Sequence, residues 1–146
     1  MPVIVIGADS AVGAAVIRAV ARPDREVRAF VSNPERAEEL RRTGIKVALG
    51  DLSDGSHVEV ASLGCFAAIL IPGAADDGRE LAFAADPAEV PRTWAQAISN
   101  AAVQRAIWIG RAEESSAPES CTIDGAGLSD EEVAIRAAEL DDAAVL

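Results

Sequence analysis

Short, β-branched apolar runs alternate with helix-forming segments along almost the whole chain, and this alternation strongly constrains the fold. The first run, Val3-Ile4-Val5-Ile6, is apolar at every position and ends at Gly7. Such a run is typical of a strand buried on both faces of a parallel sheet. Residues 11–21 are rich in alanine, carry valine and isoleucine at helical spacing, and are stopped by Pro23. The opening unit is therefore expected to be a strand, a glycine turn and a helix.

The alternation continues and predicts six strands and five helices. The expected strands are residues 3–6, 26–31, 45–49, 66–71, 105–109 and 143–146. The expected helices are residues 11–21, 34–43, 53–63, 87–104 and 129–140, and residues 73–86 and 111–127 are expected to be irregular. Right-handed crossovers between these strands predict an α/β fold, a doubly wound parallel six-stranded sheet (Rossmann fold) in the order 3-2-1-4-5-6. Residues 1–146 are expected to form a single domain.

Two helix starts carry strong local signals. Asn33 can cap a helix whose first residue is Pro34, where a missing N–H costs nothing. Ser129 and Glu132 have the spacing of a capping box, which predicts that the last helix begins there.

Charge and cysteine content exclude several classes of function. The net charge of −11 argues against nucleic acid as a partner, because binding to the phosphate backbone relies on clustered lysine and arginine. Cys65 and Cys121 match no metal or redox spacing, so no metal site is expected. No segment has the length of a signal peptide or a membrane span, which predicts a cytoplasmic protein without membrane contact. The preference for arginine over lysine favours a bacterial source.

The loop after the first strand is the main candidate for a ligand site. In a doubly wound sheet, ligands bind beyond the carboxyl ends of the strands where the strand order reverses. Backbone N–H groups at the start of the following helix can receive a pyrophosphate. Gly7 would permit the tight turn and Gly13 the close contact between helix and strand. Ser10 replaces the central glycine of the usual fingerprint, and Asp9 must point away from the phosphate if binding is to be strong.

Polar residues also follow the second and third strands. Ser32, Asn33 and Arg36 lie where the ribose of an adenosine would be expected. Arg36 could reach a 2′-phosphate or could pair with Glu39 one turn later. Asp51 and Leu52 could meet an adenine edge, with a turn-capping role for Asp51 as the alternative.

These segments together resemble the atypical short-chain dehydrogenase/reductases, and among them the NmrA-like NAD(P)-binding proteins. The resemblance is most specific in residues 3–13, 27–37 and 47–54 and continues more faintly along the rest of the chain. It implies NAD or NADP as the cofactor, without indicating which of the two, and a dinucleotide as the partner. The implied cofactor-binding residues are Gly7, Ala8, Asp9, Ser10, Ala11, Val12, Gly13, Ser32, Asn33, Arg36, Asp51, Leu52, Ile71, Pro72 and Gly73. Of these, the resemblance implies that Ile71, Pro72 and Gly73 line the nicotinamide side.

The chain departs from that family at the catalytic centre. It contains no tyrosine, so the Tyr-x-x-x-Lys pair that serves family enzymes as acid and base is absent, and no catalytic residue can be assigned. The C-terminal substrate-binding part of the family is also expected to be absent. His57 is expected to be an ordinary surface histidine, and Trp94 and Trp108 are expected to be core or interface residues rather than ligand stackers.

Three functions remain open, and the sequence does not decide whether the chain is an enzyme. The first is a nucleotide-binding domain without tyrosine-dependent chemistry, acting as a redox sensor or regulator. The second is an NAD(P)-dependent oxidoreductase that works with a partner chain or through its 73–86 loop. The third is a degenerate scaffold or interaction protein without a cofactor. Exposed apolar surface on the last helix would favour a homodimer in all three.

Overall fold

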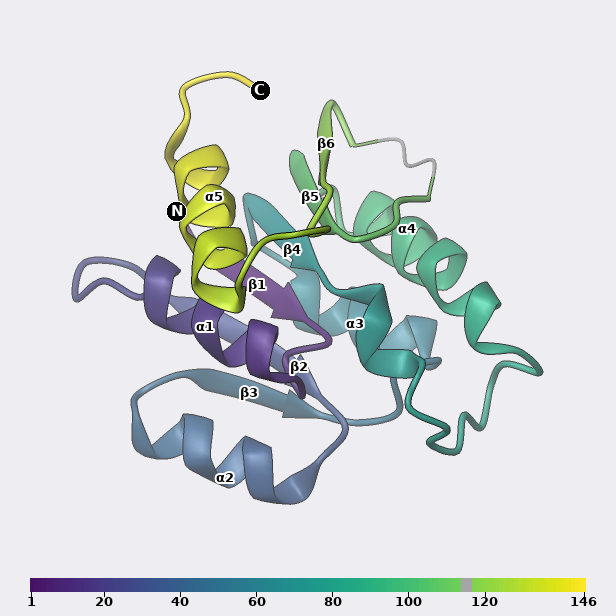
Figure 1. Ribbon diagram of the computed structural model, residues 1–146. Helices are drawn as coiled ribbons and strands as arrows, with labels where there is room; N and C mark the ends of the chain where they lie inside the picture. Colours follow the sequence, from purple (N-terminus) through teal and green to yellow (C-terminus); the bar gives the residue numbers. More distant parts are fainter. Residues whose placement is uncertain (114–116) are drawn as a thin grey trace.

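The computed structural model describes residues 1–113 and 117–146 (Figure 1). Its centre is a six-stranded sheet in the order β3-β2-β1-β4-β5-β6, and every neighbouring pair of strands is parallel. The predicted α/β fold and strand order are therefore confirmed. The strands are β1 (Val3–Ile6), β2 (Val27–Val31), β3 (Lys46–Leu49), β4 (Ala67–Leu70), β5 (Arg105–Ile109) and β6 (Glu119–Ile123).

The position predicted for the sixth strand is wrong. β6 lies within the segment expected to be irregular, of which residues 114–116 are outside the described part of the chain. β6 pairs only with β5 and is buried fully only at Ile123, so its polar sequence lacks the apolar run of a central strand. Residues 143–146 form no strand, since β6 already occupies the place beside β5. The carbonyls of Ala143 and Ala144 instead accept hydrogen bonds from Arg105 at the amino end of β5.

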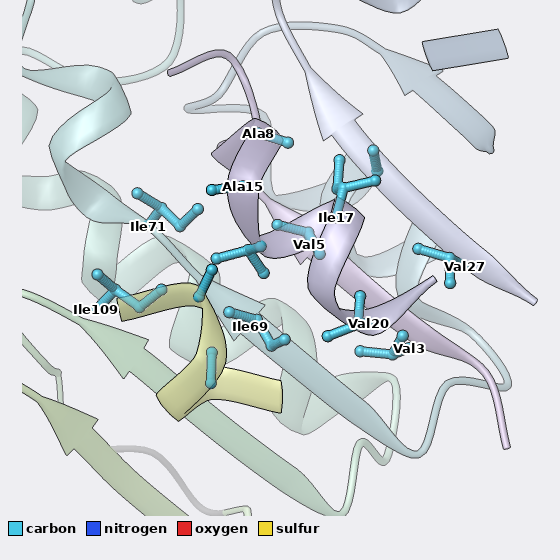
Figure 2. Close-up of a cluster of buried hydrophobic side chains, with 14 of the residues drawn as sticks. Val3, Val5, Ala8, Ala15, Ile17, Val20, Val27, Ile69, Ile71 and Ile109 are labelled. Carbon is cyan, nitrogen blue, oxygen red and sulfur yellow. The ribbon is translucent and has the colours of Figure 1, made fainter. Parts of the chain in front are cut away.

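Helices cover both faces of the sheet. One face packs against α1 (Ala11–Val20), α2 (Pro34–Arg42) and α5 (Asp130–Asp142), and Figure 2 shows the aliphatic side chains of α1 meeting those of β1, β2, β4 and β5. The other face packs against α3 (Gly55–Ser62) and α4 (Val90–Asn100). Trp94 and Trp108 are fully buried on this second face, which confirms that they are core residues.

Both predicted helix starts are confirmed. The Asn33 side chain accepts hydrogen bonds from the backbone N–H groups of Glu35 and Arg36, and Pro34 is the first residue of α2. Ser129 and Glu132 form the full capping box of α5.

The segment between β4 and β5 differs in detail from the expected loop and helix. A 3-10 turn, η1 (Pro72–Ala75), follows β4, and a second one, η2 (Pro87–Glu89), precedes α4. α4 begins later than predicted and carries Pro91 in its first turn, where the ring breaks no helical hydrogen bond. Within the described part of the chain, no helix has both the length and the apolar character needed to cross a bilayer.

Candidate functional site

The loops that follow β1 to β4 meet at one edge of the sheet, which we call the carboxyl edge. The strand order reverses between β1 and β4, since β1 continues through β2 to β3 on one side and β4 continues to β5 on the other. This reversal is where ligands bind in open α/β sheets.

Two glycines fix the backbone of the β1–α1 loop. Gly7 has a φ of +84°, and a Cβ there would lie 2.7 Å from the carbonyl oxygen of Ile71. A Cβ on Gly13 would lie 2.6 Å from the Cα of Ala8, so α1 can approach the end of β1 only with glycine at this position. The tight turn and the close contact predicted for these residues are both present.

Ser10 takes the place of the central glycine without straining the loop. Its φ is −90°, and its hydroxyl caps α1 by accepting a hydrogen bond of 3.3 Å from the N–H of Gly13. The first N–H groups of a helix have no acceptor inside the helix and form a favourable place for an anion. The predicted residues Ala11 and Val12 begin this turn of α1.

The Asp9 carboxylate points toward the end of β2. Its Oδ1 accepts hydrogen bonds of 2.9 Å from the backbone N–H groups of Ser32 and Asn33. Its Oδ2 accepts no hydrogen bond within the described part of the chain and lies 3.4 Å from Nη1 of Arg79, while the side chain is only 3% exposed. The Asp9 carboxylate thus lies at the end of β2 rather than at the N-terminus of α1, as strong binding of a phosphate at α1 requires.

The three predicted ribose residues have different surroundings. Ser32 lies beside Asp9, and its hydroxyl accepts a hydrogen bond from Arg79. Asn33 uses its side chain to cap α2. Arg36 pairs with Glu39 at 3.2 Å, which is the second of the two roles considered for it.

Asp51 and Leu52 both accept hydrogen bonds from other residues of the chain. Oδ1 of Asp51 accepts hydrogen bonds from the backbone N–H and hydroxyl of Ser53, and its Oδ2 accepts one from the N–H of Ala82. Burial acts to raise the pKa of the Asp51 carboxyl, but these hydrogen bonds outweigh it and bring the pKa below its ordinary value. Leu52 is fully buried, and its carbonyl accepts a hydrogen bond of 2.7 Å from the indole of Trp94.

Residues 76–83, here called the 76–83 loop, cross the carboxyl edge from β4 to the ends of β2 and β3. Arg79 reaches Ser32, while the N–H groups of Ala82 and Phe83 bond to Asp51 and Ser53. Arg79 also pairs through two nitrogens with Asp77, which together with Asp9 raises the pKa of the guanidinium. Sequence reasoning missed Arg79, although it is the only basic residue in the acidic segment 73–86.

The residues predicted to line the nicotinamide side follow β4 directly. Ile71 and Pro72 are buried, and the carbonyl of Ile71 lies against Gly7. Gly73 is exposed, and a Cβ there would meet no atom within 4 Å. Next to them, Arg111 donates two hydrogen bonds to the carboxylate of Asp76 and thereby ties the loops after β4 and β5 together.

His57 and the metal-ligating residue types give no sign of a second functional site within the described residues. His57 is half-buried rather than a surface residue, because its ring packs edge-on against Phe30 with centroids 4.9 Å apart. Within the described residues, no group of three histidine, cysteine or acidic side chains could hold a metal ion.

Comparison with known proteins identifies the family to which the chain belongs. A family model described as NAD(P)H-binding matches residues 7–136. A search of curated proteins gave no significant match.

Solved structures of reductases and epimerases share the fold. Triphenylmethane reductase from Citrobacter sp., complexed with NADP(H), is 25% identical with a TM-score of 0.61, over 95% of this chain and 46% of that one. The NADPH-dependent quinone oxidoreductase of Escherichia coli, complexed with NADPH, is 21% identical with a TM-score of 0.60, over 95% and 44%. A nucleoside-diphosphate-sugar epimerase from Staphylococcus aureus is 21% identical with a TM-score of 0.58, over 75% and 38%. The chain thus spans less than half the length of these proteins.

Proposed function

Since this chain belongs to the NAD(P)H-binding family, we propose that it binds the dinucleotide at the carboxyl edge of its sheet and acts as a nucleotide-responsive regulator without tyrosine-dependent redox chemistry. In this proposal the pyrophosphate lies at the N-terminus of α1 and the adenosine toward the ends of β2 and β3. The nicotinamide lies toward Ile71, Pro72 and Gly73.

The β1–α1 loop is the observation that carries this proposal. Gly7 and Gly13 bring the backbone close to the place of the pyrophosphate, and a Cβ at either position would collide with backbone atoms. Asp9, the one acidic residue of the loop, has its carboxylate on the N–H groups of Ser32 and Asn33. The residues present therefore fit a bound pyrophosphate.

The side chains at the carboxyl edge support nucleotide binding more than they support a redox reaction. A bound nicotinamide would supply hydride transfer, and the protein would need a group that gives or takes the accompanying proton. Without tyrosine in the chain, the family's usual proton donor is missing. The ionised groups next to the strand ends, Asp9, Asp51, Asp76, Arg79 and Arg111, are engaged in hydrogen bonds or ion pairs.

A second candidate function is an oxidoreductase whose active site is completed by additional protein residues. It is favoured by the likeness to reductases more than twice as long as this chain. In such a protein, the substrate would be held by a partner chain or by the 73–86 segment.

Titration of the purified chain with NAD⁺, NADH, NADP⁺ and NADPH in a calorimeter tests the proposal. We expect saturable binding of at least one nucleotide, and Gly13→Ala should abolish it because the new Cβ would displace the loop from Ala8. Gly125→Ala is the matched control, since a Cβ there makes only an ordinary 3.6 Å contact with Val133. The absence of saturable binding at millimolar nucleotide would refute the proposal and favour the scaffold alternative. Oxidation of bound NADH or NADPH by a quinone would instead favour the oxidoreductase.

A further inference from the structure

Dinucleotide-binding sheets recognise the 2′-group of adenosine at the end of β2. In this chain, the Asp9 carboxylate already lies there. The backbone N–H groups of Ser32 and Asn33 mark the end of β2 and the start of α2, and both donate to Oδ1 of Asp9 at 2.9 Å. The Asp9 side chain is 3% exposed, so this carboxylate is built into the fold. It comes from the β1–α1 loop, 23 residues before Ser32 in the chain.

A 2′-phosphate would need those same donors. In dinucleotide-binding sheets, the end of β2 meets the ribose 2′-position, where a carboxylate accepts from a 2′-hydroxyl and an arginine accommodates a 2′-phosphate. A phosphate is bound by charge-assisted hydrogen bonds from backbone N–H groups and guanidinium groups. Here the two N–H groups are taken by Asp9.

The nearby cations are also neutralised. Arg79 lies 3.4 Å from Oδ2 of Asp9 and pairs through two nitrogens with Asp77. The guanidinium thus faces two carboxylates, so that these three residues carry a net negative charge. Arg36, on the first turn of α2, is paired with Glu39.

We infer that Asp9 acts as an internal anion that excludes the 2′-phosphate of NADP(H), so that this chain selects NAD(H). Both carboxylate oxygens of Asp9 are enclosed by the protein, Oδ1 by the N–H groups of Ser32 and Asn33 and Oδ2 by Arg79 at 3.4 Å, so the negative charge is fixed at the end of β2. Asp9 is thereby a specificity-determining residue supplied by the glycine-rich loop, in place of the acidic residue that the end of β2 lacks. This inference rests on the proposed function, because it presupposes that a dinucleotide binds at the carboxyl edge.

Competition between paired nucleotides measures the selection directly. Dissociation constants of the full chain for NADH and NADPH are compared, and the fragments 5′-AMP and 2′,5′-ADP isolate the effect of the 2′-phosphate. We expect the wild type to bind NADH at least about tenfold more tightly than NADPH, with the same order for the two fragments. This comparison needs no variant and therefore does not depend on how substitutions affect folding.

Asp9→Asn tests the role of the charge. The amide oxygen can still accept from Ser32 and Asn33, but the negative charge is gone and Arg79 is freed from one partner. The ratio of the NADPH to the NADH dissociation constant should fall about tenfold, and Arg79→Ala added to this variant should reverse the gain for NADPH. Asp24→Asn is the matched control, since it removes one exposed carboxylate away from the carboxyl edge and should leave the ratio unchanged.

The outcomes separate this inference from the proposed function. If no nucleotide binds, the proposed function fails and this inference fails with it. If nucleotides bind but NADPH is preferred, or if folded Asp9→Asn keeps the wild-type ratio, only the inference about Asp9 is overturned.

Discussion

The backbone N–H of Ala82 donates a hydrogen bond of 2.8 Å to Oδ2 of Asp51, and this bond joins the 76–83 loop to the end of β3. The other carboxylate oxygen bonds to Ser53, whose hydroxyl in turn accepts from the N–H of Phe83. One carboxylate thus organises both the turn after β3 and a loop that follows β4. The loop lies against the strand ends that the proposed function assigns to adenosine, so its stability bears directly on binding.

Asp51→Asn should weaken this link. An amide keeps one acceptor but loses the charge that strengthens the hydrogen bonds from Ser53 and Ala82, which should lower the free energy of unfolding by about 1 kcal/mol. Urea unfolding measures this loss, and hydrogen exchange should locate it at Ala82 and Phe83. Asp24→Asn, which removes an exposed carboxylate, should change neither readout. Unchanged exchange at both amides would show that the link does not hold the loop.

The same carboxylate makes stability depend on pH. The pKa of Asp51 in the folded chain lies below its ordinary value of 3.8, because the hydrogen bonds it accepts outweigh the effect of burial. The folded state then binds fewer protons than the unfolded state, so the stabilisation is complete above the unfolded pKa and is lost as the pH falls through the folded pKa. The stability difference between wild type and Asp51→Asn should therefore shrink as urea unfolding is repeated from about pH 6 down to about pH 3. A difference that stays constant over this range would contradict the assignment.

Arg105 should be one of the most sensitive positions in the fold. Its side chain is 1% exposed, bonds to Glu119, and donates to the carbonyls of Leu140, Asp141, Ala143 and Ala144 at the end of α5. Arg105→Met would remove the donor that all of these acceptors share, among them the half-buried Glu119 carboxylate, and should cost about 3–5 kcal/mol in the free energy of unfolding. Arg92→Met, at a side chain 84% exposed, is the matched control and should be nearly neutral. A loss below about 1 kcal/mol at Arg105 would mean that α5 is held mainly by its apolar face.

Local signals made part of this structure predictable. The cap of α2, the capping box of α5 and the close contact of Gly13 with Ala8 depend on residues a few positions apart, and all lie where expected. The strand order followed from the alternation of strands and helices together with the handedness of crossovers.

Contacts between distant residues were not predictable. Nothing near Arg79 in the sequence indicates that it meets Asp9 and Ser32, and Arg105 binds the C-terminal carbonyls only because β5 and α5 lie side by side. β6 was missed because an edge strand does not need the continuous apolar run by which central strands are recognised. The contact of Asp9 with the end of β2, on which the inference about cofactor selection rests, also joins residues far apart in the sequence.

The two cysteines should react slowly and at different rates. Burial raises the pKa of both thiols, so little thiolate is present at neutral pH. Cys65 is 5% exposed, whereas Cys121 on the edge strand is half-buried, so iodoacetamide should label Cys121 first. Peptide mass spectrometry over time gives both rates, and labelling in urea should make them similar. Faster labelling of Cys65 in the folded chain would contradict the packing around β4.

Gly7 and Gly110 form a matched pair that separates steric collision from backbone strain. Both have a positive φ, +84° and +90°, so alanine at either position carries a similar conformational cost of about 1 kcal/mol. At Gly110 the new Cβ would meet no atom within 4 Å, but at Gly7 it would lie 2.7 Å from the carbonyl oxygen of Ile71. Gly7→Ala should therefore destabilise the chain by about 1–3 kcal/mol more than Gly110→Ala in urea unfolding. It should also weaken nucleotide binding, because relief of the collision moves the loop that leads into α1. Equal losses of stability in the two variants would show that the β1–α1 loop moves enough to accommodate the new Cβ. Glycine would then be required at position 7 only for its positive φ.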